Sequence, residues 1–260
     1  MTDTLRISTF SRTRTHDHAV ESGLYAAEDL AVELDMTQAS KTQMQQLVGG
    51  TWDLVHTNFD NVLFWAEDRG ADLLVVSALE SEPRQDLAVR PEIRTYADLR
   101  GKVIAVDAAE SGYVTPLRVM LAEAGLREHA DYTLTEFGAT DQRVEAMLAG
   151  NAYAAMVTER RQLGGGIHVI DTIGRLYTHY AGIVAVRRRW AEEHEDLLLR
   201  YLRAHLRAVR SLDPATPLTF AWDGLREMME MRRSVGFLRG AVDPARFATE
   251  FHFTKAIGGL

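Results

Sequence analysis

Arginine and histidine side chains stand close together near the start of the chain, in residues 10–18. An arginine fork binds carboxylate, sulfonate or phosphate groups through paired N–H donors, so Arg12 and Arg14 are candidate contacts to an anion. An imidazole exchanges protons near neutral pH, which makes His16 a candidate acid or base. His16 also opens a His-Asp-His triplet, but no second cluster with metal-ligand spacing follows it. We therefore predict neither a metal nor a cofactor.

A second group of candidate residues, Ser111-Gly112-Tyr113, stands just before a predicted helix. Free backbone N–H groups at a helix N-terminus bind anions, and small residues let a ligand approach the main chain. Ser111 is equally suited to cap the helix, and the two roles are compatible. Farther upstream, residues 58–61 offer amide and carboxylate groups, including Asp60, for hydrogen bonds to a polar ligand.

All of the candidate site residues share one property, which is that they stand at or just after the end of a predicted strand. Open α/β sheets bind ligands beyond the carboxyl ends of their strands, so this position predicts a single cleft. If the protein is an enzyme, the candidates for catalysis are His16, Asp60 and Glu159. The predicted ligand-binding residues are Phe10, Ser11, Arg12, Arg14, His16, Asn58, Asp60, Ser77, Ser111, Gly112, Tyr113, Phe137, Thr158 and Glu159, with Asp107 at the end of a further strand.

The elements that must position these residues alternate between short apolar runs and longer segments of helical period. Such alternation is typical of an α/β protein with mixed, mostly parallel sheets and helices on both faces. The predicted strands are 5–10, 30–36, 53–56, 73–78, 86–90, 102–106, 132–135, 154–157, 167–170 and 182–186. The predicted helices are 18–28, 41–48, 61–69, 115–124, 141–148, 197–209, 218–231 and 244–251.

The amino-acid composition argues against several classes of protein. The 260 residues include no cysteine, which excludes disulfides, thiolate metal sites and a cysteine nucleophile. The net charge of −8 argues against binding to nucleic acid, which requires a positive surface. The apolar runs are of strand length, far short of the ~20 residues that span a bilayer, so no membrane-spanning segment is expected.

The N-terminal residues show no basic stretch followed by an apolar core and a cleavage site. We therefore expect a cytoplasmic protein if the chain begins at Met1. If a leader has been removed, we expect a periplasmic or extracellular one.

Residues 21–34, 96–106 and 143–155 form three strings of note. These strings resemble type II periplasmic binding proteins, in particular the nitrate/sulfonate/taurine and thiamine-precursor binding family. Residues 21–34 are similar to its opening, in which a helix ends at Gly-aromatic before a Leu-x-Val strand. Residues 96–106 resemble its Asp-Leu-x-Gly-Lys-x-Ile entry to the second lobe, and residues 143–155 resemble its Ala-Leu-x-x-Gly-x-Val-Asp-Ala unit. The three occur in the family's order, over residues of about 5 to 210.

The resemblance implies two lobes with a ligand cleft between them. One lobe would hold residues 1–88 and 181–260, and the other residues 89–180, with crossovers near 86–90 and 177–183. Such lobes close on a ligand by hinge motion.

Two functions fit this resemblance, and a fold alone does not separate them. The first is an ABC-type solute-binding protein that binds a small organic anion or a heterocycle and docks on a permease. The alternative is a cytoplasmic enzyme, a dehydratase or decarboxylase of a small cyclic or aromatic carboxylate. The lack of cysteine counts against the family's desulfinases and its thiamine-pyrimidine synthase. An intracellular ligand sensor is a third interpretation.

Overall fold

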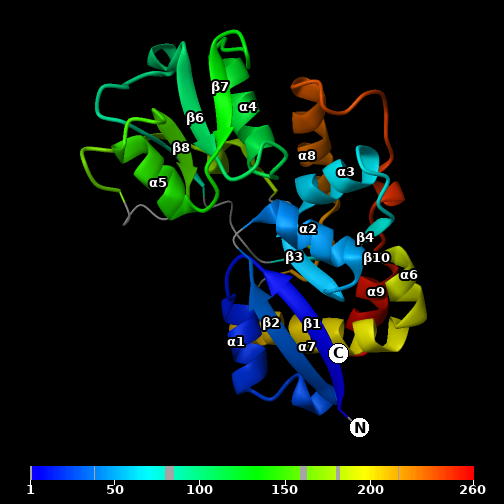
Figure 1. The fold of residues 1–260 in the computed structure, drawn as a ribbon. Coiled ribbons are helices and arrows are strands. Elements are labelled where there is room, and N and C mark those ends of the chain that lie inside the picture. The colour runs from blue at the N-terminus through cyan, green and yellow to red at the C-terminus, as the bar shows by residue number, and fades with distance from the viewer. Residues whose placement is uncertain (1, 38, 80–84, 159–162, 180–181, 216) are drawn as a thin grey trace.

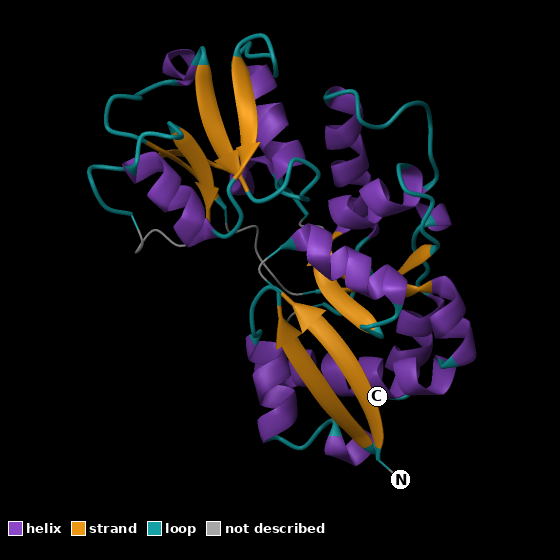
Figure 2. Cartoon of the chain, in the orientation of Figure 1, coloured by secondary structure: helices purple, strands orange, loops and turns teal. Residues whose placement is uncertain are grey.

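The computed structural model describes residues 2–37, 39–79, 85–158, 163–179, 182–215 and 217–260. The chain forms two five-stranded sheets, each covered by helices, and this confirms the predicted two-lobed α/β fold class (Figures 1 and 2). We call the first sheet with its helices the first lobe, and the second sheet with its helices the second lobe.

The sheet of the first lobe has the strand order β2-β1-β3-β10-β4. Strand β1 pairs in parallel with β2 and β3, whereas β10 is antiparallel to β3 and β4. Because β10 alone runs against the other four, the carboxyl ends of those four point the same way. The strands are β1 (Asp3–Thr9), β2 (Leu30–Met36), β3 (Leu54–Asn58), β4 (Leu73–Ala78) and β10 (Gly182–Arg187).

The sheet of the second lobe repeats this plan with the order β7-β6-β8-β5-β9. Strand β6 pairs in parallel with β7 and β8, and β5 is antiparallel to β8 and β9. The strands are β5 (Asp86–Val89), β6 (Lys102–Val106), β7 (Tyr132–Glu136), β8 (Ala154–Val157) and β9 (His168–Thr172). The exact residues at which each lobe ends stay a prediction.

Helices cover both faces of each sheet. In the first lobe, one face packs on α1, α6, α7 and α9, and the other on α2, α3 and α8. In the second lobe, α4 covers one face and α5 the other. The helices are α1 (Arg14–Glu21), α2 (Ser40–Gly49), α3 (Phe59–Glu67), α4 (Val114–Glu123), α5 (Thr140–Leu148), α6 (Arg188–Glu193), α7 (Glu195–Leu212), α8 (Trp222–Ser234) and α9 (Phe251–Ile257).

Helix α8 belongs to the first lobe by packing but also touches the second. It lies against α3 and α4, beside which Figure 1 shows it in orange. Among the described residues, no helix is both long and apolar enough to cross a membrane.

The first predicted helix, 18–28, is wrong in its limits. Helix α1 begins four residues earlier, because the Thr13 side chain accepts the His16 N–H at 3.1 Å and caps the helix. It ends by Ser22, where Gly23 takes a φ of 67°, and a short 3₁₀ turn, Ala26–Glu28, follows. His16 and Arg14 therefore lie on a helix and not on a strand-end loop.

The last predicted helix, 244–251, is also wrong. Asp243 caps a 3₁₀ turn, Pro244–Arg246, by accepting the Ala245 N–H at 2.9 Å. The α-helix of this region, α9, begins at Phe251, where the predicted one ends.

Candidate functional site

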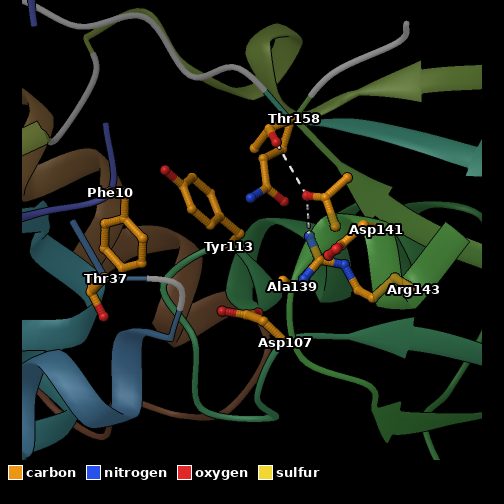
Figure 3. A pocket seen from close by; sticks show the side chains of 10 residues that line it. Phe10, Thr37, Asp107, Tyr113, Ala139, Asp141, Arg143 and Thr158 are labelled. Carbon is orange, nitrogen blue, oxygen red and sulfur yellow. Dashed lines mark hydrogen bonds between the residues drawn. The ribbon is translucent and has the colours of Figure 1, made fainter. Parts of the chain in front are cut away.

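A cavity of about 320 Å³ lies between the two lobes. Its lining follows the carboxyl ends of strands in both sheets, as expected for an open α/β sheet (Figure 3). The first lobe contributes residues that follow β1 and β2, and the second lobe residues that follow β6, β7 and β8. The lining residues are Phe10, Thr37, Gln85, Asp107, Tyr113, Ala139, Thr140, Asp141, Arg143 and Thr158.

Arg143 forms the base of the second-lobe wall and is 4% exposed. Its Nε donates to the carbonyl of Met156 at 2.8 Å, Nη1 donates to the carbonyl of Gly138, and Nη2 donates to the Thr140 hydroxyl at 3.0 Å. Burial lowers the pKa of Arg143, and Asp107 opposes that shift. Each guanidinium nitrogen thus already has an acceptor within the second lobe.

Asp107 stands at the end of β6 and is half-buried in the pocket wall. Burial raises the pKa of its carboxyl group, while Arg143 and a hydrogen bond with Ser111 pull the pKa down. Its Oδ2 also accepts from the Ser40 hydroxyl of the first lobe at 3.5 Å. Asp107 therefore joins the pocket wall to the opposite lobe.

The loop between Asp107 and α4 uses its own backbone donors. The Ser111 N–H donates to the Ala108 carbonyl at 3.0 Å, and the Gly112 N–H donates to Asn61 Oδ1 at 2.8 Å. The Tyr113 N–H is 3.5 Å from Ser111 Oγ. The N–H groups that the sequence offered to an anion are therefore directed at protein acceptors.

Three of the predicted ligand-binding residues line the pocket, namely Phe10, Tyr113 and Thr158, together with Asp107. Thr158 stands at the rim, with its hydroxyl 3.1 Å from that of Thr140. Phe10 and Tyr113 come from opposite lobes and bring two aromatic rings to the same cavity (Figure 3).

The predicted catalytic residues do not meet at this pocket. His16 is 3% exposed and lies inside the first lobe, with its Nδ1 3.4 Å from the Tyr25 hydroxyl. Asp60 is 1% exposed and accepts from Arg232 Nη1 at 2.9 Å. Glu159 lies outside the described residues.

The remaining predicted residues that the structure describes are not part of the lining. Ser11 and Arg14 are exposed, and Arg12 pairs with Asp17 at 2.7 Å. Asn58, Ser77, Ser111 and Gly112 are buried in or between the lobes, and Phe137 packs on the core beneath α5.

The pocket is also lined by residues that were not predicted from the sequence, namely Thr37, Gln85, Thr140, Asp141 and Arg143. Thr37 directly follows β2, so the strand-end rule applied to every strand would have found it. Thr140, Asp141 and Arg143 lie in the first turn of α5, and extending the rule into the following helix would have included them. Among the described residues, no group of three His, Asp or Glu side chains could hold a metal ion.

Known proteins share this architecture. The nitrate-binding protein NrtA from Synechocystis PCC 6803 superposes with a TM-score of 0.81 at 14% identity, over 99% of this chain and 89% of its own. The alkanesulfonate-binding protein SsuA from Xanthomonas axonopodis pv. citri gives 0.69 at 19% identity, over 95% and 98% of the chains. The desulfurization enzyme DszB gives 0.67 at 15% identity, over 99% of each. These likenesses establish the fold, which carries both binding proteins and an enzyme.

Sequence comparison supplies the family. No curated protein matches the chain at a significant level. A family model described as NMT1/THI5 like matches residues 18–212, three quarters of the chain, and confirms the resemblance carried by the three sequence strings. The chain belongs to this NMT1/THI5-like family.

Proposed function

We propose that this chain binds a small solute in the interlobe pocket and delivers it to the permease of an ABC importer. The observation that carries the proposal is the cavity of about 320 Å³, whose lining comes from both lobes. A solute that touches both walls stabilises the closed arrangement of two hinged lobes. The solute-binding roles named for NrtA and SsuA support the same kind of function.

The pocket walls favour a heterocycle over a bare oxyanion as the solute. Phe10 and Tyr113 bring aromatic rings from opposite lobes, and aromatic faces pack well on planar rings. Thr37, Gln85 and Thr140 add hydroxyl and amide groups that can fix the orientation of such a ring by hydrogen bonds.

Neither of the described residues predicted to catalyse a dehydratase or decarboxylase reaction, His16 or Asp60, lines the interlobe cavity. A general acid or base must come within hydrogen-bond reach of the reacting atoms. His16 is buried inside the first lobe, and Asp60 is paired with Arg232.

A solute screen tests the proposed function. Purified protein is titrated calorimetrically with small heterocycles and organic anions, and any bound compound is recovered and identified by mass spectrometry. We expect a solute that binds with 1:1 stoichiometry and is recovered unchanged. Conversion of the bound compound would contradict the proposal and favour an enzyme.

The Phe10→Ala variant tests whether the solute binds in the interlobe pocket. Loss of a well-packed aromatic contact costs about 1–3 kcal/mol, so we expect the affinity to fall roughly 5- to 150-fold. The matched control is Phe251→Ala, since Phe251 is 57% exposed on α9 and does not line the cavity. Equal affinity of the wild type and the Phe10 variant would place the site elsewhere.

A further inference from the structure

The carboxylate of Asp60, in the first turn of α3, contacts helices of both lobes. Its Oδ1 accepts from Arg232 Nη1 of α8 at 2.9 Å, and the Thr115 hydroxyl of α4 donates to the same carboxyl group. The side chains of Asp60 and Arg232 are 1% and 5% exposed, and Thr115 is equally buried. Asp60 therefore connects α3 and α8 of the first lobe to α4 of the second lobe.

A second contact joins the first lobe to α4 one turn farther along that helix. The Arg118 guanidinium lies over the ring of Phe237, 4.6 Å from its centroid, and Phe237 belongs to the turn that follows α8. A cation over an aromatic face is attracted to the ring. Arg232 Nη2 lies 3.5 Å from the Phe237 carbonyl, so the arginine that pairs with Asp60 also contacts this turn. Figure 1 shows α3 and α8 beside α4.

The position of α4 affects the pocket directly. Tyr113 lines the pocket and immediately precedes Val114, the first residue of α4. Thr115 and Arg118 lie three residues apart near the start of this helix, on one face of it. Contacts that fix this face therefore also fix where the Tyr113 ring stands relative to Phe10 of the first lobe.

The residues that make these interlobe contacts are Asp60, Thr115, Arg118, Arg232 and Phe237, and we call them the interlobe clasp. We infer that the clasp holds the two lobes together when no solute is bound, with Asp60 as its positioning residue. The described lining of the pocket includes none of the five. The inference rests on the proposed function only in its consequence, which is that a solute meets pocket walls already in place and loses less affinity to ordering them.

The electrostatics of Asp60 support this role. Burial raises the pKa of its carboxyl group, and Arg232, then Thr115 and Arg118, oppose that shift. Two of the three groups that favour the charged carboxylate come from one lobe boundary, on α4. Separation of α4 from α3 would remove a hydrogen bond and a positive charge from Asp60, and would leave the Arg118 guanidinium without the Phe237 ring.

Spin labels can test the clasp because the chain contains no cysteine of its own. Labels at Val20→Cys on α1 and Glu145→Cys on α5, both exposed positions, report the distance between the lobes of the full, ligand-free chain by double electron–electron resonance. We expect one main distance when the clasp is intact. Phe237→Ala should raise the ratio of longer to shorter distances about two- to fivefold, and Thr115→Val about tenfold or more.

Control variants separate this role from a general loss of stability. Phe251→Ala removes a ring under Lys255, 5.5 Å from its centroid, but both residues lie on α9 of the first lobe, so the label distance should not change. Phe237→Tyr keeps the ring and should match the wild-type distance. Phe237 is 44% exposed, so its removal leaves the packed core intact.

Wild-type distances in both Phe237→Ala and Thr115→Val would overturn the inference, and so would an equal shift in Phe251→Ala. These outcomes are independent of the proposed function, because the label distances are measured without a solute. A solute screen that finds no ligand would refute the proposed function and leave the result for the clasp standing.

Discussion

Two buried histidines, His56 on β3 and His205 on α7, lie against Tyr201 inside the first lobe. His56 Nε2 is 2.6 Å from the Tyr201 hydroxyl, and the His205 ring stacks on Tyr201 with 5.7 Å between centroids. Neither ring nitrogen of His205 has a hydrogen-bond partner among the residues that the structure describes. Burial is the main cause that lowers the pKa of His56 to about 3, with a smaller contribution from His205 and then His16. Burial, with a smaller contribution from His16, lowers the pKa of His205 to about 4.

The stability of the protein should therefore fall as the solution is acidified. Unfolded histidines take up protons near their ordinary pKa of 6.5, whereas folded His205 stays neutral down to about pH 4. Between these values the unfolded state binds more protons, so each such histidine costs up to about 1.4 kcal/mol of unfolding free energy per pH unit. His205→Phe should reduce this slope. Urea denaturation of both proteins at pH 8, 6.5 and 5 measures it.

A surface histidine provides the comparison. The His129 side chain is 84% exposed and its backbone has a φ of 65°, which asparagine tolerates, so His129→Asn should leave the slope unchanged. A His205→Phe protein that loses stability toward pH 5 as steeply as the wild type would contradict a buried neutral imidazole.

For single residues, the sequence predicted which ones stand at the end of a strand better than it predicted which residues they contact. Phe10, Asp107 and Thr158 could be named because each stands at or just after the end of a strand, and chain order reveals that. The buried pairing of Asp60 with Arg232 joins residues 172 apart in the chain, and no local pattern signals it. The contact in which the Gly112 N–H donates to Asn61 joins residues 51 apart in the chain, and no local pattern signals it either. Whether the predicted residues touch a ligand stays a prediction.

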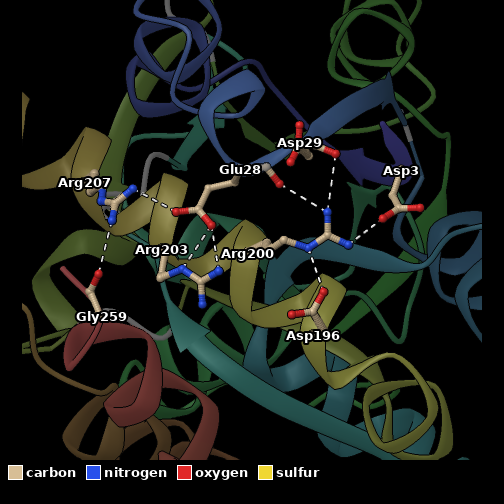
Figure 4. A network of polar contacts seen from close by, with 8 residues as sticks. All are labelled: Asp3, Glu28, Asp29, Asp196, Arg200, Arg203, Arg207 and Gly259. Carbon is tan, nitrogen blue, oxygen red and sulfur yellow. Dashed lines mark hydrogen bonds and ion pairs between the residues drawn. The ribbon is translucent and has the colours of Figure 1, made fainter. Parts of the chain in front are cut away.

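Among the helices, α7 is attached to the rest of the first lobe by a row of arginines (Figure 4). The Glu28 carboxylate, 9% exposed, accepts from Arg203 at 2.7 and 3.0 Å and from Arg207 at 2.8 Å. Arg200 extends the row to Asp3 at 2.5 Å and Asp196 at 2.8 Å. Glu28 is thus shared between two arginines that are one turn apart on the same helix.

Removal of this carboxylate should loosen α7. Glu28→Ala leaves Arg203 and Arg207 without their common acceptor, and we expect a loss of about 1–3 kcal/mol because both arginines are partly exposed and regain water. For a chain of this size the melting temperature should fall by about 2–4 °C for each kcal/mol. Glu192→Ala, at an exposed position of α6, should change it little. Equal melting temperatures for the two variants would show that the row contributes nothing.

Whole elements were predicted most accurately where an apolar run is bounded by turn residues on both sides. Strands β2, β4, β6 and β8 have the limits expected from the sequence, and nearly every residue of β4 and β8 is buried. Helix ends were less accurate because they depend on capping contacts. The Thr13 cap of α1 and the Asp243 cap of the 3₁₀ turn are hydrogen bonds that hydrophobic periodicity does not encode.

For the molecule as a whole, three contacts join the first turns of α2 and α3 to the loop that follows β6. The Gly112 N–H donates to Asn61 Oδ1 at 2.8 Å, and this contact is buried. The Ser40 hydroxyl lies 3.5 Å from Asp107, and Lys41 lies 3.3 Å from Glu110. The loop thus lines the pocket on one side and attaches to the opposite lobe on the other, so we expect ligand binding to be coupled to the arrangement of the lobes.

The buried contact should dominate this coupling. Asn61→Ala leaves the Gly112 N–H without its acceptor, at a cost of about 1–3 kcal/mol, and should shift the ligand-free protein toward an open arrangement. Lys41→Ala removes only a partly exposed ion pair, which is worth about 0–1 kcal/mol.

Small-angle X-ray scattering should therefore show a larger radius of gyration for ligand-free Asn61→Ala than for Lys41→Ala or the wild type. Saturating solute should give all three proteins the same radius of gyration. Because solute affinity scales with the fraction of closed protein, Asn61→Ala should also bind more weakly. If its scattering and affinity match those of Lys41→Ala, the lobes are held together by α8, which packs on α3 and α4, and not by the loop.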